Sequence, residues 1–118
     1  MSRYEELVTA AKRNIIEISP AEAAAQARSG EATIIDVRKK DEWDAGHIPD
    51  ARHLSRGTLE VEIEDAVADP DALLILHCGA GGRSALAAES LQRMGYKHVR
   101  SMAGGFKAWK AAGLPTTT

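Results

Sequence analysis

The single cysteine of the chain, Cys78, opens a glycine-rich segment that reads Cys-Gly-Ala-Gly-Gly-Arg-Ser over residues 78–84. The apolar run at 73–76 before it predicts a buried strand, and the periodicity of residues 84–94 after it predicts a helix. The thiol is therefore expected on a tight turn between a strand and a helix N-terminus. Backbone N–H groups and the helix dipole converge at such a turn and favour negative charge. We expect the thiol to ionise readily there, and the thiolate is the nucleophilic form.

The rest of the predicted loop fits this chemistry. Its members are Gly79, Ala80, Gly81, Gly82, Arg83 and Ser84. The glycines let the backbone approach one sulfur atom closely, so that N–H groups can stabilise a negative terminal sulfur without a metal ion. Arg83 is predicted either to bind the oxyanion of a substrate or to tie the loop to a carboxylate such as Asp36. Ser84 either donates a hydrogen bond to the sulfur or caps the helix.

The elements that position this loop alternate between strand and helix along the chain. Strands are expected at 15–18, 33–37, 51–54, 73–77 and 98–102. Helices or helical turns are expected at 3–13, 19–29, 39–45, 59–67, 83–94 and 103–113. The alternation predicts an α/β fold with a central, mostly parallel sheet and helices on both faces. The first helix is expected to be an extension (residues 1–14), whose role is left open between covering the sheet, joining two copies and fraying.

Three more polar residues are candidates for the rim of the site. Asp36 and Arg38 lie at the end of the strand predicted at 33–37, and Arg56 lies in a later loop. Functional crevices in open α/β sheets lie beyond the carboxyl ends of the strands, which is where these residues are expected. There they would contact substrate, although a local salt bridge for Asp36 and Arg38, or a solvated position for Arg56, would also explain them.

Composition limits the possible partners. The chain has 118 residues, enough for one domain, with a net charge of -2 at pH 7, so bulk charge suggests neither a nucleic acid nor a membrane surface as partner. No apolar run approaches membrane-spanning length, and the first residues lack the apolar stretch of a secretory signal. A lone cysteine cannot form an internal disulfide, which favours the cytoplasm. Four histidines (His47, His53, His77 and His98) are too dispersed to form a recognisable metal motif.

Several motifs together resemble a single-domain rhodanese. They are Ile35-Asp36-Val37-Arg38, Glu42-Trp43, Gly46-His47-Ile48-Pro49-Asp50-Ala51, the Cys78 to Ser84 loop, Gly104-Gly105-Phe106-Lys107-Ala108-Trp109 and Gly113-Leu114-Pro115. The resemblance covers residues 15–115, which leaves the N-terminal extension and a tail at 116–118 outside it. Asp50 departs from the pattern, because the family usually has glycine there, so we expect a changed local turn and unchanged activity.

The resemblance implies a sulfurtransferase. In this family the cysteine takes a sulfane sulfur from a donor such as thiosulfate and becomes a persulfide. A thiophilic acceptor, either cyanide or a thiol, then removes the sulfur. For this chain the resemblance assigns the covalent role to Cys78, predicts ping-pong kinetics and requires no cofactor. A protein is also a possible sulfur acceptor.

Other functions compete with this interpretation. The fold could serve as a persulfide relay or as a non-catalytic binding module, and Cys78 could merely pack in the core. Cysteine phosphatases also use a glycine-rich loop closed by arginine, but their loop is one residue longer, and arsenate reductases of the thiol type usually need further cysteines. Apart from Arg83 the loop carries no charge. This neutrality leads to the hypothesis of a bulkier or less charged donor than thiosulfate.

Overall fold

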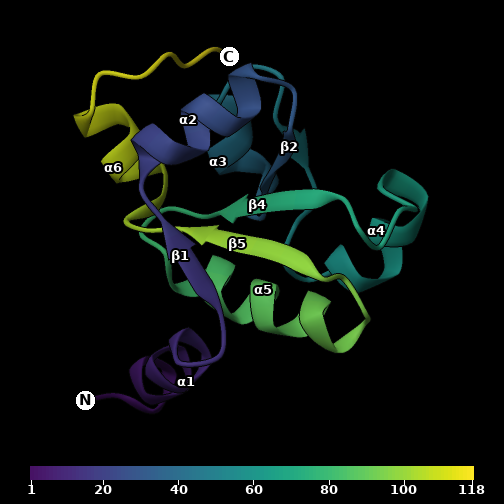
Figure 1. Cartoon of the computed structure of the whole chain (residues 1–118). Coiled ribbons are helices and arrows are strands. Elements are labelled where there is room, and N and C mark those ends of the chain that lie inside the picture. Colours follow the sequence, from purple (N-terminus) through teal and green to yellow (C-terminus); the bar gives the residue numbers. More distant parts are fainter.

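The computed structural model describes residues 1–118 and consists of one sheet between two layers of helices (Figure 1). The strands are β1 (Ile16–Ile18), β2 (Ala32–Asp36), β3 (Arg52–His53), β4 (Leu73–His77) and β5 (His98–Met102). The helices are α1 (Arg3–Lys12), α2 (Pro20–Arg28), α3 (Lys40–Ala45), α4 (Leu59–Ala66), α5 (Gly82–Arg93) and α6 (Gly105–Ala111). None of these helices has the length and apolar content needed to cross a membrane.

All neighbouring strands of the sheet are parallel, in the order β1-β5-β4-β2-β3. The central strand β4 pairs with β2 in a register that sets Asp36 opposite His77. The two strands therefore end at the same edge of the sheet, and Cys78 follows the last residue of β4. The α/β fold with a mainly parallel sheet is confirmed, and every strand pair proves to be parallel.

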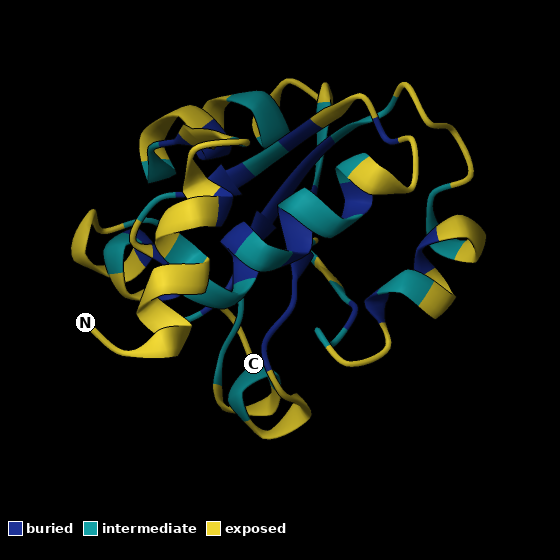
Figure 2. Ribbon diagram, turned by 90° about the horizontal axis from the view of Figure 1, so that it is seen from below, coloured by how far each residue is buried: buried dark blue, intermediate teal, exposed yellow.

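Alternate residues of the strands supply two separate apolar layers. Ile35, Leu74 and Leu76 pack with α4 and α5 in one layer, whereas Ile34 and Ile75 pack with α2 and α6 in the other. Strands buried on both faces are near-continuously apolar, which explains the composition of β2 and β4. In Figure 2 the dark blue, buried segments lie along the central strands and the inward faces of the helices.

Local signals in the sequence account for how elements begin and turn. Ser19 and Glu22 form a reciprocal capping box, with Pro20 in the first turn of α2. Asp50 has φ of 66°, in the left-handed region that favours glycine. Aspartate tolerates this conformation better than most residues do. The turn therefore has a geometry that glycine would also adopt.

Candidate active site

Cys78 lies directly after β4, and its sulfur is enclosed by the loop that leads into α5. The residue is 1% exposed. The Gly81 N–H donates to Sγ at 3.1 Å and the Ser84 N–H at 3.4 Å, while the Ser84 hydroxyl oxygen lies 3.6 Å from Sγ. The predicted cluster of N–H groups therefore forms around the thiol.

Backbone N–H groups of α6 help to orient this loop by donating hydrogen bonds to its carbonyl groups. Phe106 N–H donates to the Cys78 carbonyl at 2.7 Å, and Lys107 N–H donates to the Gly79 carbonyl at 3.1 Å. The close approach requires Gly105, because a Cβ there would lie 2.5 Å from the Cys78 carbonyl oxygen. Two loop carbonyls are thus held by α6, while N–H groups farther along the loop point at the sulfur. Sequence reasoning assigned Gly105 no role in the site, although the Gly104-Gly105 pair was a visible signal.

The hydrogen bonds at the sulfur favour its ionised form. Desolvation by burial, the largest single influence, raises the pKa of Cys78. Hydrogen bonds from the Ser84 N–H, the Ser84 hydroxyl and the Gly81 N–H act in the opposite direction and together outweigh burial. The pKa of Cys78 is therefore lower than that of an ordinary cysteine. Gly81 is the N-cap residue of α5, so Ser84 lies in the first turn at the sulfur and is not the cap.

Arg83 closes the outer side of the loop through a pair of hydrogen bonds to a carboxylate. Its Nη1 and Nη2 donate to the two oxygens of Glu42 at 2.7 and 3.1 Å. The hydrogen bonds from Arg83 hold the pKa of Glu42 at about 2. The prediction that Arg83 ties the loop to a carboxylate is therefore confirmed, but the carboxylate is that of Glu42 and not that of Asp36.

Asp36 and Arg38 are buried beneath the loop, so their predicted place at the rim is wrong, and the alternative, a local salt bridge between them, is confirmed. Arg38 Nε and Nη2 donate to the Asp36 carboxylate, with the Nη2 contact at 2.8 Å, and Nη2 also donates to the Gly46 carbonyl. The guanidinium lies 4.2 Å from the centre of the Phe106 ring. Because every charge finds a partner inside, the pair can be buried and cannot contact a substrate.

His77 belongs to the same buried network. Its Nδ1 lies 3.2 Å from the carbonyl oxygen of Cys78, and its Nε2 lies 3.5 Å from Asp36 Oδ2. Burial lowers the pKa of His77 and so favours the neutral ring, whereas the Asp36 carboxylate acts in the opposite direction. His77 contacts the backbone of Cys78 and not its sulfur, and no geometry supports a role as base for the thiol.

Arg56 lies beside the loop, as expected for a rim residue. It lines a cavity of about 290 Å³ together with Lys39, Lys40 and Arg83. Most of this positive charge is already paired. Arg56 binds Glu60 at 2.8 Å, Lys40 binds Asp44 at 2.9 Å, and Arg83 binds Glu42. The structure brings no group of three His, Cys, Asp or Glu side chains together that could hold a metal ion.

A parallel α/β sheet whose central strand leads into a cysteine surrounded by N–H donors defines an α/β protein with a cysteine-centred site. The chain matches the rhodanese-like domain family over residues 19–112. It is 39% identical over 101 residues to the thiosulfate sulfurtransferase GlpE of Ectopseudomonas mendocina, which covers 86% of this chain and 89% of that protein. The chain therefore belongs to the rhodanese-like family of sulfurtransferases.

Solved structures agree with the fold. A Rhodopseudomonas palustris protein of unknown function, described as a possible tyrosine phosphatase, has a TM-score of 0.90 and 32% identity and covers 99% of this chain and 96% of its own. The polysulfide-sulfur transferase homodimer from Wolinella succinogenes has a TM-score of 0.84 and 31% identity, with 97% and 86% covered. The alignments with these two structures extend over nearly the whole of this chain, beyond the residues that match the family.

Proposed function

We propose that this protein moves a sulfane sulfur from a small donor, such as thiosulfate, to a thiophilic acceptor through a persulfide on Cys78. The observation that carries the proposal is the convergence of the Gly81 and Ser84 N–H groups on Sγ. These donors lower the pKa of Cys78 and so favour the thiolate, which is the attacking form. A reducing compartment such as the cytoplasm would keep the lone thiol available.

The chemistry proceeds in two displacements. The Cys78 thiolate attacks the outer sulfur of thiosulfate, so that a new S–S bond forms while the old S–S bond breaks and sulfite leaves with its electron pair. The terminal sulfur of the persulfide keeps the negative charge, next to the N–H groups of the loop. Cyanide, or a thiolate of a small molecule or protein, then attacks that sulfur and releases the Cys78 thiolate.

The loop favours sulfur transfer over phosphate-ester cleavage. Four residues, Gly79 to Gly82, separate Cys78 from Arg83. Two of the N–H groups already converge on the single Sγ atom, which fits one sulfur better than a tetrahedral phosphate. The Arg83 guanidinium is held by Glu42 and so is less free to bind phosphate oxygens.

Intact-mass measurement tests the proposal directly. The protein is incubated with thiosulfate and then with cyanide, in parallel with Cys78→Ser. We expect the wild type alone to gain one sulfur atom and to lose it to cyanide as thiocyanate. If neither thiosulfate nor any other sulfane-sulfur donor adds mass to the wild type, the proposed function is wrong.

A further inference from the structure

The N-terminal helix α1 lies against the active-site loop. In Figure 1, β4 and β5 end on the left of the view, with α6 above the loop and α1 below it. A Cβ at Gly82 would collide with the Tyr4 hydroxyl and would lie 3.5 Å from Val8 Cγ2. Gly82 is thus a site of close approach between the loop and α1. Asn14, just after α1, donates to Glu89 of α5 at 2.9 Å and helps to fix the helix there.

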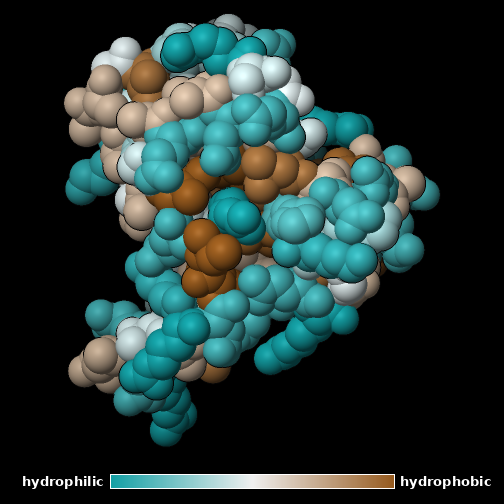
Figure 3. All heavy atoms as spheres, viewed as in Figure 1, coloured by the Kyte–Doolittle hydropathy of each residue, from teal (hydrophilic) through white to brown (hydrophobic).

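A groove of about 450 Å³ lies between α1 and this loop. Met1, Tyr4 and Val8 form its apolar wall, and Ala80 and Gly82 form the wall on the loop side. We call this the α1 groove. Its volume is within the range of sites that bind small organic molecules. In Figure 3, α1 forms a separate lobe at the lower left of the molecule.

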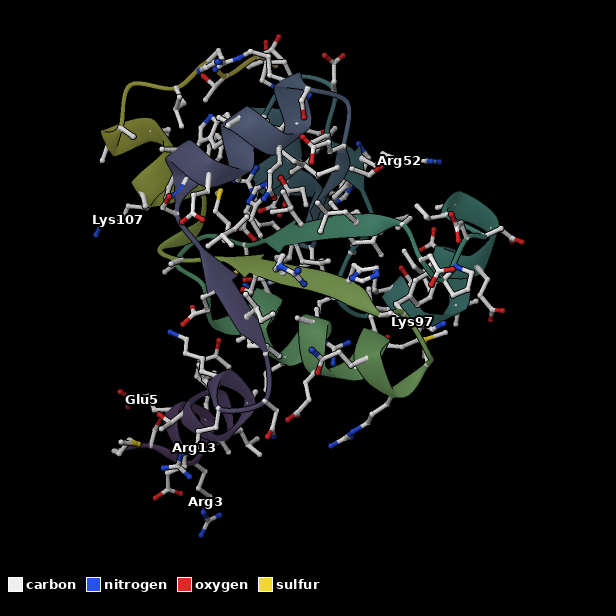
Figure 4. The ribbon with its side chains drawn as sticks, in the orientation of Figure 1. Arg3, Glu5, Arg13, Arg52, Lys97 and Lys107 are labelled. Carbon is white, nitrogen blue, oxygen red and sulfur yellow. The ribbon has the colours of Figure 1, made fainter.

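The α1 groove borders the loop that encloses the sulfur of Cys78, through Ala80 and Gly82. Its loop-side residues, Ala80 and Gly82, flank Gly81, whose N–H donates to Cys78 Sγ at 3.1 Å. A molecule in the groove therefore lies beside the loop that holds the sulfur. The charged side chains of the groove, Glu5 and Lys12, have opposite signs, so the side chains of the groove carry no net charge. Figure 4 shows Glu5 extending outward from α1.

The two sides of the loop thus differ in chemistry. On the Arg83 side the guanidinium groups and Lys40 are engaged by carboxylates, which weakens their attraction for a small dianion. On the α1 side an aromatic ring and aliphatic groups line the larger hollow. An apolar body bound there would leave its sulfur-bearing end free to approach the loop.

We propose that the α1 groove is a substrate subsite that holds the apolar organic body of a sulfane-sulfur donor, with Tyr4 and Val8 as its walls. This inference rests on the proposed sulfur transfer and names its substrate class as organic donors such as thiosulfonates. The Cys78 thiolate attacks the outer sulfur of R–SO₂–S⁻. An S–S bond forms to Cys78, the S–SO₂R bond breaks, and the sulfinate R–SO₂⁻ leaves with the electron pair.

The test compares two donors that differ only in the organic body, benzenethiosulfonate and methanethiosulfonate. The readout is the ratio of their kcat/KM values, with cyanide as acceptor. Tyr4→Ala is expected to lower the benzene-to-methane ratio about fivefold, which is the scale of one lost aromatic contact. Tyr4→Phe keeps the ring and should keep the ratio. Leu7→Ala is the matched control, because Leu7 is on the same helix, 61% exposed, and not part of the groove wall.

Two results would contradict the proposal that the α1 groove is a substrate subsite. An unchanged ratio in Tyr4→Ala, or an equal fall for both donors, would show that Tyr4 does not contact the organic body. A dimer in sedimentation experiments that Tyr4→Ala dissociates would show instead that a second copy covers the groove. Failure of the wild type to gain sulfur from either thiosulfonate or from thiosulfate would refute the proposed function itself, a result separate from a change in the ratio.

Discussion

Two arginine–carboxylate pairs lie within a short distance of the Cys78 loop, in opposite environments. In the inner pair the side chains of Arg38 and Asp36 are 6% and 0% exposed, and in the outer pair those of Arg83 and Glu42 are 33% and 32% exposed. The contact distances are nearly equal, at 2.8 and 2.7 Å. Solvent exposure, and not hydrogen-bond geometry, is therefore what distinguishes them.

The difference in exposure suggests different roles for the two pairs, one in the stability of the loop and one in the charge that a substrate meets. Inside the protein an unpaired charge is very costly, so the inner pair is stable only while both partners and the Gly46 carbonyl are present. At the surface, water replaces a lost partner and an ion pair contributes little to stability. We therefore expect the inner pair to control whether the loop folds, and the outer pair to control which charges a substrate meets.

Removal of the inner carboxylate should have the largest effect. Asp36→Ala leaves the Arg38 guanidinium buried without its counter-charge, and we expect the free energy of unfolding to fall by about 3–5 kcal/mol. Urea denaturation followed by circular dichroism measures this change. The matched variant Glu42→Ala should lose less than about 1 kcal/mol. Equal losses in the two variants would contradict the contrast between the pairs.

The sequence predicted the fold well because its signals are local. The capping box of Ser19 and Glu22 marks the start of α2, and the apolar composition of β2 and β4 marks strands covered on both faces. The strand predicted at 51–54 was less reliable, since only Arg52 and His53 pair with β2. That strand is at the edge of the sheet, where few contacts impose a pattern on the residues.

The site was predicted where its residues are consecutive and missed where the fold brings distant residues together. The loop from Cys78 to Ser84 could be interpreted from its glycines and flanking elements. Glu42 is 41 positions from Arg83, so no spacing rule links them. Asp36 is a charged residue at the end of a strand, and its burial follows only from Arg38, which turns back onto it.

The outer pair can be broken without removing the cationic residue. Glu42→Gln keeps the shape of the side chain but removes the negative charge that neutralises Arg83. We expect kcat/KM for thiosulfate to rise roughly threefold at low salt and this gain to shrink as ionic strength increases. Stopped-flow or initial-rate measurements with thiosulfate and cyanide give the comparison.

The control for this prediction has the same change in net charge far from the loop. Asp71→Asn removes the partner of Lys97 in an exposed pair at 3.4 Å, which lies before the start of β4, at the opposite end of that strand from Cys78. It should leave the thiosulfate rate nearly unchanged. An equal rise in both variants would mean that total charge is responsible and that Arg83 is not.

Acid should break the ion pair between Arg83 and Glu42 by protonating the Glu42 carboxylate, over a defined pH range. The pKa of Glu42 is about 2 in the folded protein, against 4.5 for the free side chain. Because the folded-state value is depressed, the pair stabilises the protein fully above about pH 4.5, and this contribution is lost as the pH falls toward 2. The effect is the smallest of the three, below about 1 kcal/mol, because solvent screens a half-exposed pair. Urea midpoints of the wild type and Glu42→Gln should differ most near neutral pH and converge toward pH 2 to 3. A difference that stays constant across this range would show that the Glu42 carboxylate does not stabilise the fold through its charge.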